Sequence, residues 1–221
     1  KEKEFNEKAY CAAIRSAIKA LNETGATDAV LFLTEVPLKN RSLAWKIRQA
    51  ALIAENAIYR FEQFKSQKSE MRRPLRKLTF TVERRSDLPA AEEAAAQGKA
   101  IAEGMALTRT LGNLPGNVCT PTHLARTAEK IAADHALKCE ILDREAMEKL
   151  GMNALLSVAR GSHQAPQFIV VHYRGADLDK RPIVLIGKGV TFDSGGISLK
   201  TGADMDEMKF DMCGAASVLG T

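Results

Sequence analysis

The sequence predicts an α/β fold, and two patterns along the chain carry this prediction. Short apolar runs rich in β-branched residues are typical of strands, and they lie at 28–36, 77–83, 139–142, 167–173 and 182–186. Longer stretches between them repeat apolar residues at steps of three and four, which is typical of amphipathic helices. Because strands alternate with helices, we expect a largely parallel or mixed sheet.

The first 86 residues predict a helix–strand–helix–strand order. Apolar spacing indicates a helix over 4–24, and Gly25 is expected to cap it because glycine reaches the left-handed conformation easily. The following elements are a buried strand at 28–36, an amphipathic helix at 41–65, a loop at 66–76 that contains Pro74, and a half-buried strand at 77–83. These residues are interpreted as part of one α/β domain.

A second domain is predicted after a connecting helix. Residues 88–111 are rich in Ala and Glu and indicate a helix, which Gly and Pro break sharply at 112–117. Thr120 and Pro121 then supply an N-cap and a first helical residue. This helix runs to about 137 and is followed by a strand at 139–142, a helix at 144–150, strands at 167–173 and 182–186, and a new helix in the last residues. The predicted boundaries are 1–86, 87–111 and 112–221.

Composition excludes several classes of protein. The 221 residues are 45% apolar, which is enough for a core, and no run approaches the roughly 18 apolar residues of a membrane span. The N-terminus is charged and lacks the apolar region of a secretory signal. The first residue is not Met, so we expect the natural chain to begin earlier. The four cysteines are isolated in sequence and indicate reduced thiols in a cytoplasmic protein.

Positive charge is concentrated between residues 39 and 85. This basic segment holds 13 Lys and Arg against 4 Asp and Glu, a net charge of +9, which leaves −4 for the rest of the chain. Such a segment could attract nucleic acid by neutralising phosphates. A solvated surface whose charges pair with acidic groups is the favoured interpretation, because basic clusters alone are weak evidence.

Residues 183–214 hold the most informative chemistry. Lys188 directly follows the predicted strand at 182–186, and ligands bind at the carboxyl ends of strands in open α/β sheets. A glycine-rich loop beginning at Asp193 comes next, followed by Lys200, Asp206, Glu207, Lys209 and Asp211. The spacing excludes a phosphate-binding loop and a dinucleotide fingerprint. On composition alone, surface ion pairs and a metal-binding or catalytic cluster both remain open.

The string GKGVTFDSGGISLK, followed by MDEMKFDMCGA, resembles the leucyl aminopeptidase family, the M17 metallopeptidases. The segment TRTLGNLPGNVCTP at 108–121 is also similar to the start of that family's catalytic domain. The resemblance implies the end of a macro-like N-terminal α/β domain at 1–86, a connecting helix at 87–111, and the first part of a metallopeptidase catalytic domain with a central mixed sheet at 112–221. It also implies that the chain is truncated at both ends.

The resemblance implies a hydrolase that releases N-terminal, preferably apolar, residues from peptides. Two divalent metal ions, Mn²⁺ or Zn²⁺, would activate the attacking water. The implied roles are Lys188, Asp193 and Asp211 as metal ligands, Lys200 as the catalytic group that stabilises the oxyanion, and Met208 as a residue of the substrate side-chain pocket. Lys188 would bind through a neutral amine, whose pKa a nearby cation and burial would lower.

Further expectations follow from the same resemblance. The remaining ligands, in an Asp-x-Glu motif, and a catalytic Arg would lie beyond Thr221, so a chain ending there should be inactive. The whole protein would be a cytoplasmic homo-hexamer acting on peptides, without membrane association. One alternative is a DNA-binding accessory protein in transcription control or site-specific recombination, which would use the basic segment at 39–85. A degenerate, inactive member of the family is another alternative, against which the intact Lys188, Asp193, Lys200 and Asp211 argue.

Overall fold

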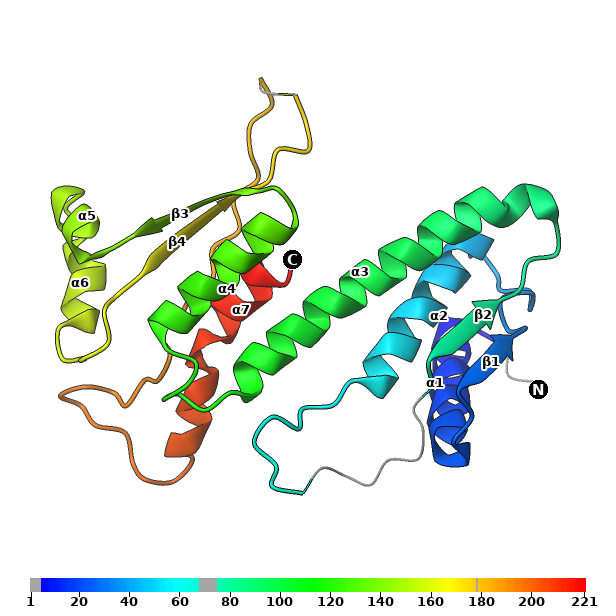
Figure 1. Ribbon diagram of the computed structural model, residues 1–221, viewed down its shortest axis with the longest axis horizontal. Coiled ribbons are helices and arrows are strands. Elements are labelled where there is room, and N and C mark those ends of the chain that lie inside the picture. The colour runs from blue at the N-terminus through cyan, green and yellow to red at the C-terminus, as the bar shows by residue number, and fades with distance from the viewer. Residues whose placement is uncertain (1–4, 68–74, 178) are drawn as a thin grey trace. The chain divides into compact units, whose positions relative to one another are not determined.

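The α/β class predicted from the sequence is confirmed. A computed structural model describes residues 5–67, 75–177 and 179–221, and it contains helices with two small sheets in those ranges (Figure 1). The chain divides into two compact units between Ala106 and Leu107. This division falls inside one long helix, so the three domain boundaries expected from the sequence stay predictions.

The first unit follows the predicted order of helices and strands. Its elements are α1 (Glu7–Thr24), β1 (Asp28–Leu31), α2 (Leu43–Ile58), β2 (Lys77–Phe80), the short 3-10 helix η1 (Arg85–Asp87), and the beginning of α3 (Leu88–Asn113). Side chains cap two of these helices: Asn6 accepts from the backbone N–H of Ala9, and Ser42 accepts from that of Trp45. Gly25 ends α1 with φ 75°, as predicted.

The core of the first unit lies between two helices and one face of the sheet. β1 and β2 pair in parallel, and α1 and α2 pack on them. The buried cluster includes Tyr10, Ile14, Ile18, Leu31, Leu38, Ala50, Ile53, Ala54 and Leu75. The Tyr10 hydroxyl donates to the backbone carbonyl of Lys46 at 3.0 Å, so this fully buried phenol keeps a hydrogen-bond partner. Each buried large side chain contributes about 1.5–3 kcal/mol by leaving water.

Two elements of the first unit are shorter than predicted. The strand expected at 28–36 ends at Leu31, because the chain turns there and the Thr34 hydroxyl donates to the carbonyl of Thr81 at 2.8 Å. The prediction that this strand is buried is wrong, since Val30 is 55% exposed and the helices cover the other face. The helix expected at 41–65 ends at Ile58, beyond which Phe61 and Phe64 contact each other. Residues 68–74 of the expected loop, including Pro74, lie outside the described residues.

The second unit contains the end of α3 and the elements that follow it. These are α4 (Pro121–Asp134), β3 (Lys138–Leu142), α5 (Arg144–Lys149), α6 (Asn153–Ala159), β4 (Phe168–His172), the 3-10 helix η2 (Met205–Met212) and α7 (Cys213–Leu219). Thr120 caps α4 by accepting from the N–H of His123, and Pro121 is the first helical residue, as predicted. β3 and β4 pair antiparallel and contact α4. The short helix α6 was not predicted.

The prediction of a strand at 182–186 is wrong, since these described residues form none. This stretch has no regular secondary structure, and its apolar side chains are exposed, with Ile183 and Ile186 each 91% exposed. A strand needs a neighbour to pair with, and the only pairs in the described part of the chain are β1 with β2 and β3 with β4. Composition alone therefore did not decide the conformation of this stretch.

Two expectations about the whole chain can be compared with the described residues. All four cysteines are free thiols, as predicted. No helix in the described ranges combines the length and apolar character that crossing a bilayer requires.

Gly98 lies at a close contact between α2 and α3. A methyl group on it would lie 2.4 Å from the backbone oxygen of Arg48 and 2.9 Å from Cβ of Ala51. We expect Gly98→Ala to lower the midpoint of thermal unfolding, because an overpacking cost of about 1–3 kcal/mol exceeds the roughly 1 kcal/mol that Ala gains in a helix. Gly161→Ala, which meets nothing within 4 Å, is the control. An unchanged midpoint for Gly98→Ala would contradict the packing of α2 on α3.

Candidate functional site

The five residues singled out from the sequence lie together in the second unit. Lys188, Asp193 and Lys200 come from the glycine-rich segment 187–200, and Met208 and Asp211 come from η2. Polar contacts between the side chains connect all five. The structure therefore brings together every residue that the sequence nominated.

Lys188 and Asp211 form the closest charge pair of the cluster. Nζ of Lys188 donates a hydrogen bond to Oδ1 of Asp211 at 2.7 Å and lies 2.6 Å from Oδ2. Oδ2 is itself buried and accepts no hydrogen bond. Both carboxylate oxygens of Asp211 therefore lie within ion-pair distance of the same ammonium.

Asp193 lies between the two lysines. Its Oδ2 is 3.2 Å from Nζ of Lys200 and 4.0 Å from Nζ of Lys188. Its Oδ1 accepts a hydrogen bond from the backbone N–H of Gly195 at 2.9 Å, which fixes the carboxylate at the start of the loop. One carboxylate therefore contacts both amines from different sides.

The loop after Asp193 returns the chain toward the same carboxylate. Gly195 has φ 94° and Gly196 has φ 68°, a conformation that other residues rarely adopt. The N–H of Lys200 donates to the carbonyl of Ser194 at 2.9 Å, which closes the loop. The Lys200 side chain then donates to Sδ of Met208 at 2.8 Å. Loop closure is the local reason why Lys200 lies close to Asp193.

The electrostatics of the cluster favour charged side chains. The hydrogen bond to Asp211 raises the pKa of Lys188 above its usual range, and the charges of Asp211 and Asp193 add to this effect. The Gly195 N–H, followed by Lys200, lowers the pKa of Asp193. Among the chain's own groups, Lys188 is therefore an ammonium, because the hydrogen bond to Asp211 raises its pKa more than burial lowers it.

The donors of this cluster fit a divalent cation. The carboxylates of Asp193 and Asp211 both lie within 4.0 Å of the Lys188 amine, and Oδ2 of Asp211 is buried. No group of three or more His, Cys, Asp or Glu side chains suited to a metal occurs in the described ranges, and the nitrogen beside the two carboxylates is the Lys188 amine. That amine becomes a ligand only after it loses its proton.

The position of the cluster in the fold differs from the expectation. Lys188 was expected at the carboxyl end of a buried strand, but residues 182–186 form none in the described structure. The cluster is instead held by the glycine-rich segment, η2 and the first turn of α7, where the N–H of Ala215 donates to the carbonyl of Lys188 at 2.8 Å. Sequence reasoning missed this backbone contact, for which Gly187 and Gly214 were the available signal.

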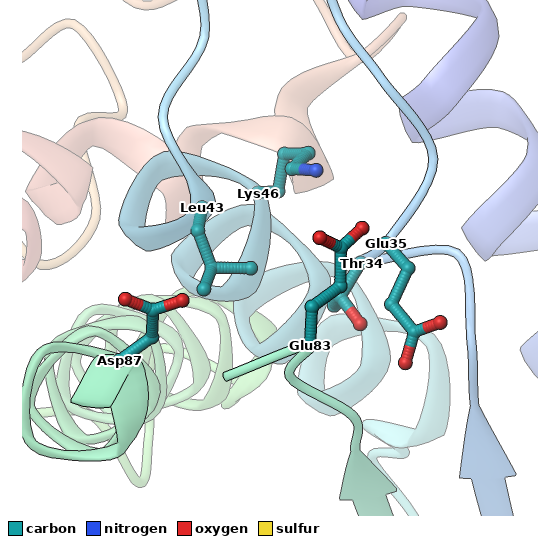
Figure 2. Close-up of a pocket in the computed structure, with 6 residues that line it drawn as sticks. All are labelled: Thr34, Glu35, Leu43, Lys46, Glu83 and Asp87. Atoms are coloured by element: carbon teal, nitrogen blue, oxygen red, sulfur yellow. The ribbon is translucent and has the colours of Figure 1, made fainter. Parts of the chain in front are cut away.

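The first unit contains a small pocket that shares no residue with this cluster (Figure 2). Its volume is about 140 Å³, and it is lined by Thr34, Glu35, Leu43, Lys46, Glu83 and Asp87. Lys46 is buried, donates to the carbonyl of Val36 at 2.9 Å, and has a pKa lowered by its burial. The Lys46 ammonium is therefore hydrogen-bonded to a residue of the first unit.

The basic segment is partly neutralised within the fold. Nε of Arg41 is 2.6 Å from Oε1 of Glu7, Arg48 donates to Gln97, and Lys46 is buried. Part of the segment lies in residues 68–74, outside the described structure. Among these contacts only Arg41 with Glu7 pairs opposite charges, so the interpretation of a solvated surface paired with acidic groups stays a prediction. The contacts give the DNA-binding alternative no support.

Comparison with known proteins gives two family matches along the chain. The catalytic domain of the cytosol aminopeptidase family matches residues 106–221, and its N-terminal domain matches residues 1–68. A probable cytosol aminopeptidase from Dechloromonas aromatica (strain RCB) is 66% identical over the whole chain, and one from Thioalkalivibrio sulfidiphilus (strain HL-EbGR7) is 52% identical. The chain spans 44% and 45% of their lengths.

A solved structure agrees with these matches. The bottromycin maturation enzyme BotP in complex with Mn superimposes with a TM-score of 0.78 at 30% sequence identity. The match covers 96% of this chain and 42% of that one. Because the catalytic-domain match alone covers more than half of the residues, the chain belongs to the cytosol aminopeptidase family.

Proposed function

We propose that the protein containing this chain is a metal-dependent aminopeptidase that releases N-terminal, preferably apolar, residues from peptides. The observation that carries this proposal is the convergence of Lys188, Asp193 and Asp211, with Lys200 on the other side of Asp193. Membership of the cytosol aminopeptidase family supports peptide hydrolysis. The chain spans less than half of its relatives, so activity, substrates and partners are proposed for the whole protein.

Lys188, Asp193 and Asp211 would hold two divalent metal ions, Mn²⁺ or Zn²⁺, together with ligands from the rest of the protein. The closeness of both carboxylates to the Lys188 amine supports this role, and so does the Mn in the complex of the similar enzyme BotP. When bound, the cations would polarise the scissile carbonyl, hold the free α-amine and lower the pKa of a bridging water. Lys188 would bind as a neutral amine, with its proton released to solvent when the cation binds, and Asp193 and Asp211 would bind through their carboxylates.

Lys200 would remain protonated and act on the substrate. Its ammonium is 3.2 Å from Asp193, and the closed loop positions it beside the proposed ligands without its serving as one. A positive charge at this place would stabilise the oxyanion that forms when water attacks the peptide carbonyl. The two lysines would thus hold opposite protonation states during the reaction, each set by its own surroundings.

Met208 would line the pocket for the first side chain of the peptide. Its sulfur contacts Nζ of Lys200, so it lies within reach of the reacting group. A flexible thioether suits a pocket that accepts several apolar side chains. For the whole protein we also propose a cytoplasmic location and a homo-hexameric assembly, both implied by the family.

Removing the charge of Lys200 tests its catalytic role. In the full-length protein, Lys200→Ala should lower kcat for leucine amides by at least about 10²-fold, because oxyanion stabilisation is lost. Metal content should stay near that of the unmodified protein, since Lys200 is not a ligand. Elemental analysis beside the kinetics checks both, and Lys209→Ala, whose side chain lies over the Phe210 ring, is a matched control. Turnover at the unmodified rate would remove Lys200 from the mechanism.

Metal removal tests the cofactor. Prolonged dialysis of the full-length protein against a chelator should abolish hydrolysis, and added Mn²⁺ or Zn²⁺ should restore it, because carbonyl polarisation and water activation are supplied by the cations. Addition of Mg²⁺ alone should restore less, since an amine is a poor ligand for that ion. Full activity after complete metal removal would overturn the proposed function.

The length of the chain provides a separate test. The 221-residue chain by itself should bind Mn²⁺ weakly and hydrolyse leucine amides at the background rate, because the remaining ligands would be absent. Titration with Mn²⁺ and an amidase assay, run beside the full-length protein, measure both. Metal-dependent turnover by the 221-residue chain would show that the site is complete without further residues.

A further inference from the structure

Two glycines allow the segment carrying Lys188 to contact the helical run that carries Asp211. A methyl group on Gly187 would lie 2.3 Å from the backbone oxygen of Gly214 and 2.6 Å from Cα of Ala215. A methyl group on Gly214 would lie 2.9 Å from the backbone nitrogen of Lys188. All three distances are too short for the Cβ atom of a real side chain, so the two backbones touch only because both residues are glycine.

This backbone contact fixes Lys188 on both sides of its α-carbon. Its nitrogen faces Gly214, and its carbonyl accepts a hydrogen bond from Ala215 at 2.8 Å. The main chain of Lys188 is therefore held against α7 by close packing and a hydrogen bond together.

The same contact sets the distance between the two charged side chains. Asp211 lies three residues before Gly214, at the end of η2, which continues directly into α7. Moving α7 away from residues 187–189 would move Asp211 away from Lys188. The 2.6–2.7 Å spacing of Nζ and the carboxylate oxygens thus depends on how closely the two glycines approach.

We propose that Gly187 and Gly214 are positioning residues that set the spacing of Lys188 and Asp211 for a shared divalent cation. This inference rests on the proposed function, in which Lys188 and Asp211 are ligands. Neither glycine touches substrate or metal. Their effect passes through the backbone, and its readout is the affinity for the cation.

The test measures Mn²⁺ binding by the full-length protein well below its unfolding temperature, with free Mn²⁺ followed by electron paramagnetic resonance. Gly214→Ala should raise the Kd for Mn²⁺ by roughly 10–100-fold, the range typical of supporting residues around a metal. Gly189→Ala introduces a smaller steric overlap at the same contact, since its methyl group would meet only Cβ of Ala215, at 3.2 Å. It should raise the Kd by a smaller factor and keeps the test valid if Gly214→Ala does not fold.

Two controls separate positioning from loss of stability. Gly202→Ala adds a methyl group in open space within the same unit and should leave the Kd unchanged. Gly98→Ala creates a closer overlap in the first unit, 2.4 Å against 2.9 Å for Gly214→Ala, so it should lower the unfolding temperature and leave the Kd unchanged. A rise in Kd for the Gly189 and Gly214 variants alone supports the inference.

The outcomes also separate this inference from the proposed function. If the unmodified protein binds neither Mn²⁺ nor Zn²⁺, the proposed function fails and the inference fails with it. If Lys188→Ala abolishes binding while Gly189→Ala and any folded Gly214→Ala keep the original Kd, only the positioning role is overturned. If Gly98→Ala raises the Kd as much as these variants do, the effect is one of stability and the inference is again overturned.

Discussion

The contact between Lys188 and Asp211 joins the glycine-rich segment to η2, and the rest of the cluster is arranged around it. Asp193 lies at the edge of this pair and reaches Lys200, which in turn contacts Met208. An ammonium occupies the centre because two carboxylates surround it, and carboxylates so close together need a cation between them. In the proposed function, a metal ion would meet the same requirement beside a deprotonated Lys188 amine.

Local signals in the sequence predicted the parts of the fold that depend on local contacts. Gly25 and the Thr120–Pro121 pair marked helix ends correctly, because a cap is decided by the few residues around it. The stretch 182–186 failed for the opposite reason: its composition suits a strand, but a strand forms only beside another strand. The predicted length of β1 was wrong for a similar reason, since the Thr34 hydroxyl donates a hydrogen bond to Thr81, a residue 47 positions away.

More of the candidate site than of the fold around it could be predicted from the sequence. Its five residues were nominated by resemblance of two short strings to a family, and the chain does belong to the cytosol aminopeptidase family. What the strings could not give was the protonation of Lys188, which depends on its exposure and on the distance to Asp211. The glycine contact was also missed, because it joins positions 27 residues apart, and glycines mark where backbones can approach without showing which segments meet.

The stretch 182–186 has a practical consequence for work with this polypeptide. Ile183, Val184, Leu185 and Ile186 present four consecutive apolar side chains to water, each more than half exposed. An exposed, uncharged apolar run of this kind can serve as a template onto which a second molecule adds its own backbone. A chain of this length, purified by itself, should therefore aggregate as its concentration rises. Replacing Val184 with a charged residue should slow this aggregation and leave Lys188 unchanged.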